Sequence, residues 1–201
     1  GKLGTIWGED VMEIKYGLIS CDSHAQPDKD AFTSRMSQAR WGDAIPHLME
    51  TTDKAHMAVA IDRPVQRWVA NGQVVGNRGV VNCPTVMDDP MRKYFPQHWD
   101  EVPSYVYNPA DRLSALDKDG VDGEVLFPND PVQSGTFFQG SAEFELDCLR
   151  AYNDTLAEWR EVSDRYVPLA IIPYMSGIDV TVAEVQRAVK KGHRGIVMLA
   201  E

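Results

Sequence analysis

The second half of the chain alternates apolar segments with amphipathic ones. Asn108 followed by Pro109 is typical of a helix start, and Gly120 is typical of a helix stop. Residues 121–127 then read as a buried strand, and the run Pro128-Asn129-Asp130-Pro131 must turn because it cannot extend a ladder. The pattern from Asn108 onward therefore predicts a helix, a strand and a turn.

The same alternation continues towards the C-terminus. The further elements are predicted over residues 141–163 (helix), 166–174 (strand), 178–190 (helix) and 195–199 (strand). In the second of these helices, Ile178, Val182, Val185 and Val189 step by 4, 3 and 4 positions, which is typical of an amphipathic helix. The last strand is apolar throughout, as in a strand that is covered on both faces.

Residues 16–24 fit the first strand of this series. Apolar strands that alternate with amphipathic helices predict an α/β fold with a parallel sheet and right-handed crossovers. The chain is expected to form one partial domain, made of an N-terminal extension (1–15), an insertion (25–107) and regular strand–helix units (108–201).

The insertion is too long for a structureless loop in a compact domain. Within it, Asn71-Gly72 separates residues 67–70 from 73–75, which is a strong signal for a two-residue hairpin. The insertion leaves the carboxyl end of the first strand, where α/β folds place their sites. We expect it to be either a lid over a pocket or a stabilising or subunit-contact element; large apolar insertions also favour a homo-oligomer.

The net charge of the chain argues against two classes of binding partner, nucleic acids and membranes. The chain has 201 residues, and its 30 acidic and 20 basic side chains give a formal net charge of -10. Such a field repels phosphate backbones and anionic lipid headgroups, so no nucleic-acid and no membrane partner is expected. The longest strongly apolar stretch, residues 167–174, is far short of the roughly 20 residues that a spanning helix needs.

The cysteines and the N-terminus bear on the compartment. Cys21, Cys83 and Cys148 are odd in number and widely spaced, so they do not close into a disulfide framework. Acidic residues interrupt the first 15 positions where a signal peptide would need an apolar core. These features favour a cytoplasmic protein.

Asp22 and His24 are the two residues whose side chains most clearly suggest a functional role. Side chains alternate along a strand, so these two should share a face with Leu18 and Ser20. At the carboxyl end of the strand they lie close enough to bind one cation through a carboxylate oxygen and an imidazole nitrogen. The alternative is that they cap a turn or pair with each other.

Three ordered runs carry a family resemblance. They are L-I-S-C-D-S-H-A-Q-P at 18–27, N-P-A-D-R-L through D-G-V-D-G-E-V-L-F-P at 108–128, and A-Y-N-D with D-R-Y-V-P at 151–168. Together they resemble the amidohydrolase-2 branch of the metal-dependent amidohydrolase superfamily. That branch includes metal-dependent hydrolases and the aminocarboxymuconate-semialdehyde and hydroxybenzoate-type decarboxylases.

The resemblance implies a (β/α)8 TIM barrel with one divalent cation at its carboxyl-end mouth. Asp22 and His24 would be two of the ligands, and the aspartate, in place of a commoner histidine, admits manganese as well as zinc. The family's further histidine and aspartate come from later strands, and Glu201 falls on the fourth strand by our count. We expect only the first four strand–helix units here, either as a fragment of a longer enzyme, which we favour, or as a half-barrel that associates with another.

The other histidines are interpreted as structural. His193 precedes its strand and so lies at the amino end of the barrel, away from the chemistry. His47, His56 and His98 lie in the insertion and are expected to be surface or packing residues.

The resemblance implies a metal-dependent hydrolase in which an activated water attacks a small-molecule substrate. One alternative is non-oxidative decarboxylation of a small aromatic or enoic acid, and another is an inactive barrel fragment that serves as an assembly or binding subunit. Asn129, after the second strand, is a candidate substrate contact, although turn formation alone would explain it. The sequence assigns no catalytic acid or base.

Overall fold

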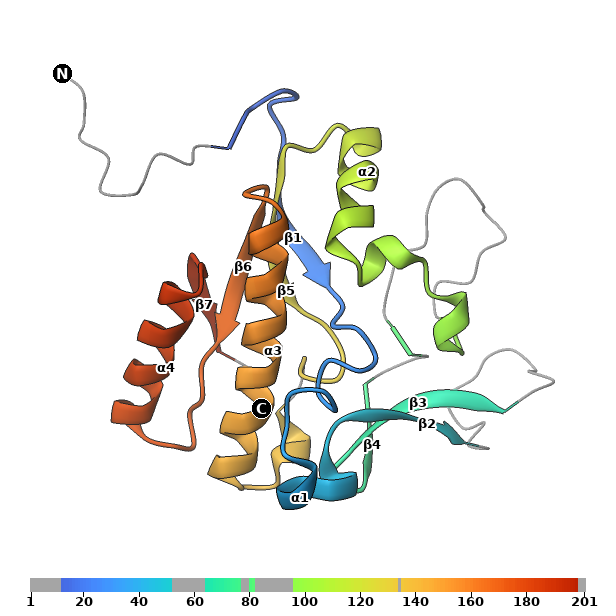
Figure 1. Cartoon of the computed structure of the whole chain (residues 1–201), viewed down its shortest axis with the longest axis vertical. Coiled ribbons are helices and arrows are strands. Elements are labelled where there is room, and N and C mark those ends of the chain that lie inside the picture. The colour runs from blue at the N-terminus through green and yellow to red at the C-terminus, as the bar shows by residue number, and fades with distance from the viewer. Residues whose placement is uncertain (1–11, 52–63, 77–79, 82–95, 134, 199–201) are drawn as a thin grey trace.

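A four-stranded parallel sheet forms the centre of the molecule. The computed structural model describes residues 12–51, 64–76, 80–81, 96–133 and 135–198 (Figure 1). The strands lie in the order β1 (Ile19–Ala25), β5 (Gly123–Pro128), β6 (Tyr166–Ile171) and β7 (Gly195–Val197), and every neighbouring pair is parallel. The predicted α/β fold with a parallel sheet is confirmed.

Three long helices alternate with these strands. They are α2 (Pro109–Asp119), α3 (Ala142–Val162) and α4 (Ile178–Lys190). The Asn108 side chain accepts hydrogen bonds from the backbone amides of Ala110 and Asp111, and Gly120 ends α2 in the left-handed region at φ 68°. The predicted helix boundaries are therefore confirmed to within one or two residues.

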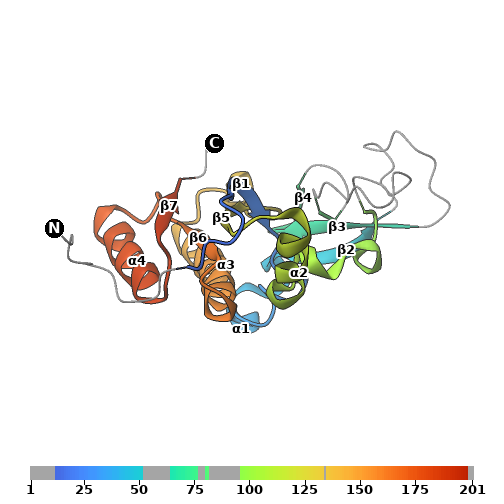
Figure 2. The same cartoon turned by 90° about the horizontal axis from the view of Figure 1, so that it is seen from above.

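All three helices lie on the same side of the sheet (Figure 2). The opposite face carries no helix in the described part of the chain. Ile196 of β7 is 51% exposed, so the expectation that this strand is covered on both faces is wrong for the described residues. The apolar sequence of β7 therefore predicts more burial than the described residues around this strand provide.

Helix α4 has its predicted bounds, but its apolar stripe does not face the sheet. Ile178 is 72% exposed, and Val182 and Val189 are about half-exposed. The buried positions are Ala188 and Glu184. The helix therefore docks partly through polar contacts, and the described residues leave Ile178, Val182 and Val189 of its stripe exposed while Val185 is half-buried.

Glu184 makes these polar contacts. Its carboxylate is fully buried and accepts hydrogen bonds from Arg187 at 2.8 Å, from the Asn153 side chain at 2.9 Å and from Arg150 at 3.2 Å. Burial opposes ionisation, but these donors outweigh it and lower the pKa of Glu184. An ionised buried carboxylate thus fixes α4 against α3.

The insertion forms a second, antiparallel sheet. Its strands are β2 (His47–Thr51), β3 (Val65–Ala70) and β4 (Gln73–Val75), in that order. Asn71 and Gly72 have φ values of 50° and 73°, as a two-residue turn of type I′ requires, so the predicted hairpin is confirmed. This sheet lies beyond the carboxyl ends of β1 and β5 (Figure 1).

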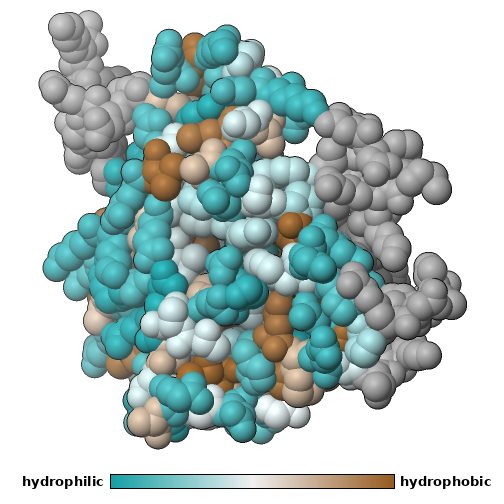
Figure 3. Space-filling model, turned by 45° about the vertical axis from the view of Figure 1, so that its right-hand side comes forward, coloured by the Kyte–Doolittle hydropathy of each residue, from teal (hydrophilic) through white to brown (hydrophobic). Residues whose placement is uncertain are grey.

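Short helices complete the described structure. They are α1 (Gln38–Trp41) and the 3-10 turns Gly42–Ala44, Trp99–Glu101, Ser104–Val106 and Thr136–Phe138. No helix in the described ranges combines the length and apolar character that crossing a membrane requires. The face in Figure 3 is mainly hydrophilic, with apolar side chains in small separate patches.

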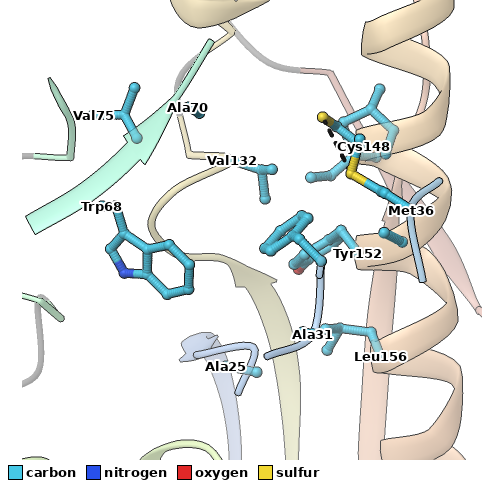
Figure 4. Packing of buried hydrophobic residues seen from close by; sticks show 14 of the residues in the cluster. Ala25, Ala31, Met36, Trp68, Ala70, Val75, Val132, Cys148, Tyr152 and Leu156 are labelled. Atoms are coloured by element: carbon cyan, nitrogen blue, oxygen red, sulfur yellow. Dashed lines mark hydrogen bonds between the residues drawn. The ribbon is translucent and has the colours of Figure 1, made fainter. Parts of the chain in front are cut away.

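The insertion and the parallel sheet share one hydrophobic core. Trp68 of β3 packs in one cluster of buried side chains with Tyr152 and Leu156 of α3 (Figure 4). Leu126 of β5 belongs to the same cluster. Each of these four side chains is fully buried. Because they pack in one cluster, the small sheet is fixed relative to the strand ends rather than attached as a separate module.

The carboxylate of Asp122 holds the segment before β1 in place through hydrogen bonds. Asp122 accepts hydrogen bonds from the backbone amides of Lys15, Tyr16, Gly17 and Leu18, at 2.6 to 3.2 Å. Burial opposes its ionisation, but the four donors outweigh it and lower the pKa of Asp122. The clamp lies at the amino ends of β1 and β5 and helps to set their register.

A buried ion pair joins α2 to β5, and its loss is expected to destabilise the fold. Arg112 donates to both oxygens of Glu124 at 2.7 and 2.8 Å, and the side chains are 14% and 6% exposed. Arg112→Met leaves a buried carboxylate unpaired, so the free energy of unfolding should fall by about 3–5 kcal/mol in urea titrations. The double variant Arg112→Met/Glu124→Leu should recover much of that loss.

The matched control for this experiment is Arg40→Met. Arg40 pairs with Glu143 at the surface, where the side chains are 46% and 77% exposed. Such pairs contribute about 0–1 kcal/mol. Equal losses for Arg112→Met and Arg40→Met would contradict a structural role for the buried pair.

Candidate metal centre

A β-bulge shapes the part of β1 that carries the candidate ligands. Ser20 pairs with Glu124 and Ser23 pairs with Leu126, so three steps along β1 oppose two along β5. The hydroxyls of Ser20 and Ser23 lie 2.7 Å apart and form a hydrogen bond. The simple alternation that grouped Leu18 and Ser20 with Asp22 and His24 therefore does not hold across the bulge.

Asp22 and His24 nevertheless lie side by side. The His24 Nε2 atom is 3.9 Å from Asp22 Oδ1. The Asp22 side chain is 91% exposed and that of His24 is 39% exposed. Both groups are open to solvent at the carboxyl end of the strand, so a ligand from solution can reach them.

A backbone carbonyl orients the imidazole. His24 Nδ1 lies 2.7 Å from the carbonyl oxygen of Pro128, the last residue of β5. Because a carbonyl only accepts, Nδ1 carries the proton of the neutral ring and donates it, which leaves the lone pair of Nε2 free. Metal-ligating histidines are typically held by such a bond from the other ring nitrogen.

The two donors fit half of a coordination shell. Bonds of about 2.1 Å from one cation at a tetrahedral angle separate two ligand atoms by about 3.4 Å, and small rotations of the exposed Asp22 side chain cover the difference from 3.9 Å. Carboxylate and imidazole together suit zinc and manganese. No group of three histidine, cysteine, aspartate or glutamate side chains that could hold a metal occurs among the described residues.

The other histidines do not join this pair. His193 is 1% exposed at the start of β7, where its Nε2 lies 2.8 Å from the carbonyl oxygen of Asn153. Burial lowers the pKa of His193, as expected for a packed structural residue. In the insertion, His47 Nδ1 lies 2.7 Å from the carbonyl of Ile45 and His98 is buried, whereas His56 lies outside the described residues.

Asn129 lies at the carboxyl end of β5, as predicted. It is 3% exposed, and its side-chain oxygen accepts a hydrogen bond from the backbone amide of Asp130 at 3.0 Å. This bond is the local turn contact that sequence reasoning gave as the alternative. Contact of Asn129 with a substrate stays a prediction.

Gln26 is a residue of this edge that the sequence did not single out. It is fully buried, and its side-chain nitrogen donates to the carbonyl oxygen of Asp130 at 2.7 Å. Its Oε1 has no hydrogen-bond donor among the described residues. Gln26 therefore connects the segment after β1 to the loop after β5. This contact lies two residues further along both segments than the contact of His24 with Pro128.

Glu145 is the second such residue. It is fully buried in the first turn of α3 and accepts hydrogen bonds from the backbone amides of Tyr174 and Met175, each at 3.1 Å. Burial raises the pKa of Glu145, although these two donors partly offset it. The residue fixes the loop after β6, and no local pattern separates it from exposed acids such as Glu143.

Comparison with known proteins supports the fold. Neither a protein-family model nor a curated protein matches the chain. In structure it is similar to an amidohydrolase from Mycobacterium avium subsp. paratuberculosis K-10, with a TM-score of 0.60 and 13% sequence identity. The match covers 90% of this chain and 49% of that one, so the chain spans about half the length of the amidohydrolase. At this identity the similarity shows the α/β fold alone.

The contact with Pro128 makes a prediction about the tautomer of His24. In its neutral form, His24 should be protonated on Nδ1 and not on Nε2. Long-range 1H–15N correlation spectra distinguish the two forms. Observation of the Nε2-protonated form would show that the carbonyl does not orient the ring and would remove a support for metal ligation.

Proposed function

We propose that the chain is the N-terminal half of a (β/α)8 barrel and works as a metal-dependent hydrolase on a small-molecule substrate. The observation that carries the proposal is the approach of Asp22 and His24 to 3.9 Å at the carboxyl edge of β1, with His24 Nδ1 held by Pro128. The sequence resemblance to the amidohydrolase-2 branch and the fold similarity to an amidohydrolase support the same reaction class.

Asp22 and His24 would hold one divalent cation, with zinc first and manganese as the alternative. When bound, such an ion lowers the pKa of a coordinated water to about 7 and polarises a carbonyl group. His24 contributes an imidazole of fixed orientation, because Pro128 restrains its Nδ1 side. Asp22 contributes a carboxylate that is free to rotate towards the ion, since its side chain is 91% exposed.

The uncovered apolar surfaces support the half-barrel architecture. Most of the α4 stripe, Ile196 of β7 and the free edges of β1 and β7 lack partners in the described part. Four more strand–helix units would cover them and would supply the further ligands that the resemblance implies. The odd number of cysteines supports a reducing compartment for the proposed activity, which we propose to be the cytoplasm.

The proposal predicts that the pair binds metal. Titration of the purified chain with zinc and with manganese, followed by calorimetry and elemental analysis, should show affinity weakened by about tenfold or more in Asp22→Ala and in His24→Ala. Circular dichroism should stay unchanged, because both side chains are at the solvent-facing strand end.

His47→Ala and Asp43→Asn are the controls for this titration. His47 is a half-buried histidine of the insertion, and Asp43 is an exposed acid. Both variants should bind metal like the parent chain. Undiminished binding in Asp22→Ala and His24→Ala would remove the proposed ligands, and a chain without stoichiometric metal would favour an inert assembly or binding subunit.

Decarboxylation is the alternative reaction, because it uses the same fold and metal. An acid would protonate the carbon that remains after carbon dioxide leaves. We expect panels of amide and ester substrates to be hydrolysed by the complete barrel, with rates that fall in Asp22→Ala, while aromatic and enoic acids release no carbon dioxide. Steady, enzyme-dependent release of carbon dioxide would replace the hydrolase proposal by the decarboxylase.

A further inference from the structure

The backbone pairing of β1 with β5 ends at the edge that carries the candidate metal ligands. The last paired residues are Ala25 of β1 and Pro128 of β5. Proline has no N–H group, so neither Pro128 nor Pro131 can donate a backbone hydrogen bond across this edge. The position of the segment after β5 therefore depends on hydrogen bonds that side chains supply.

Gln26 supplies such bonds directly after the last paired residue of β1. It is fully buried, and its side-chain nitrogen donates to the carbonyl oxygens of Asp130 at 2.7 Å and of Pro27 at 3.1 Å. Its backbone amide donates to the carbonyl oxygen of Val106 at 3.2 Å. One residue thus holds the end of β1 to the loop after β5 and to the 3-10 turn Ser104–Val106.

The surroundings of Gln26 leave one orientation for its amide group. Asp130 and Pro27 both present carbonyl oxygens, which only accept hydrogen bonds, so the NH2 group must face them. The side-chain oxygen, Oε1, is buried and has no donor among the described residues. Because a buried acceptor without a donor is unfavourable, Gln26 contributes to the edge through its nitrogen alone.

The bond to Asp130 acts on the carbonyl group that orients His24. Pro128, which accepts from His24 Nδ1 at 2.7 Å, lies two residues before Asp130. The His24 ring also lies beside Phe127, with ring centroids 6.1 Å apart, but this contact does not distinguish the two ring nitrogens. If the stretch from Pro128 to Asp130 moves away from β1, Nδ1 loses its acceptor and the proton is no longer confined to that nitrogen.

We propose that Gln26 is a positioning residue for the Asp22–His24 centre. By holding Asp130 it keeps the Pro128 carbonyl against His24 Nδ1, and it thereby keeps His24 Nε2 as the nitrogen that is free to bind a cation. Gln26 acts through His24 and is not itself a ligand. The part of this inference that concerns the cation rests on the proposed function, whereas the effect on the His24 ring needs no metal.

Gln26→Met tests this role, because it keeps the length of the side chain but removes the donor to Asp130. In long-range 1H–15N spectra of the metal-free chain, the Nε2-protonated form of neutral His24 should appear beside the Nδ1-protonated form. Zinc titrated into the same variant should bind about tenfold more weakly than to the parent chain, because the bond that orients a ligand is weakened.

Gln26→Asn is the second variant, in case Gln26→Met does not fold. It keeps the amide group, but the side chain is one methylene shorter and does not reach the Asp130 carbonyl. The same change of the His24 tautomer and the same loss of zinc affinity are expected.

Tyr166→Phe is the matched control. Tyr166 is also fully buried and donates to a backbone carbonyl, that of Pro109 at 2.5 Å, but this bond joins β6 to the start of α2. The variant loses a hydrogen bond of the same kind, so it should lower stability in urea titrations. It should leave both the His24 tautomer and the zinc affinity unchanged.

The outcomes separate this inference from the proposed function. His24 that stays protonated on Nδ1 alone in the Gln26 variants, or an equal change in Tyr166→Phe, would overturn the positioning role, and so would an unchanged zinc affinity. Zinc binding that depends on Asp22 and His24 would stand in that case. Conversely, a tautomer change in the Gln26 variants of a chain that binds no zinc would support the hold of Gln26 on His24 and refute the metal centre.

Discussion

The parallel pairing of β1 with β5 is the constraint on which the rest of the structure depends. These strands are separated in sequence by the whole insertion, yet they pair from Ile19 opposite Gly123 to Ala25 opposite Pro128. Side chains fasten the pair at both ends: Asp122 binds the amides before β1, and His24 binds the carbonyl that ends β5. The register that results presents Asp22 and His24 together at the carboxyl edge.

Buried polar groups, rather than apolar surface alone, place the helices around this pair of strands. Glu124 is held by Arg112 of α2, Glu184 joins α4 to α3, and Glu145 of α3 holds the loop after β6. Each contact has directional requirements that an apolar contact lacks, so each fixes an orientation as well as a distance. The apolar side chains of Ile178, Val182 and Val189 on α4 stay exposed in the described part of the chain.

The shared hydrophobic core gives the candidate site its rigidity. Trp68 of the insertion packs in the same cluster as Leu126 and Tyr152, so the hairpin is held against the strand ends by buried apolar area. The loop that carries Asn129 and Asp130 is thereby fixed to the same scaffold. A site built on such supports needs little reorganisation to bind a ligand.

The sequence by itself determined the elements of the regular half, because their signals are local. Asn108, Pro109 and Gly120 set the bounds of α2, the turn at Asn71 and Gly72 set the hairpin, and the D-x-H triplet located the candidate ligands. The tertiary structure decided what depends on contacts between distant segments. It introduced the bulge in β1, which periodicity does not encode, and it buried Gln26 and Glu145, which no local pattern distinguishes from exposed residues of the same type. It also left the α4 stripe exposed, because an amphipathic pattern specifies that a face is to be covered but not which segment covers it.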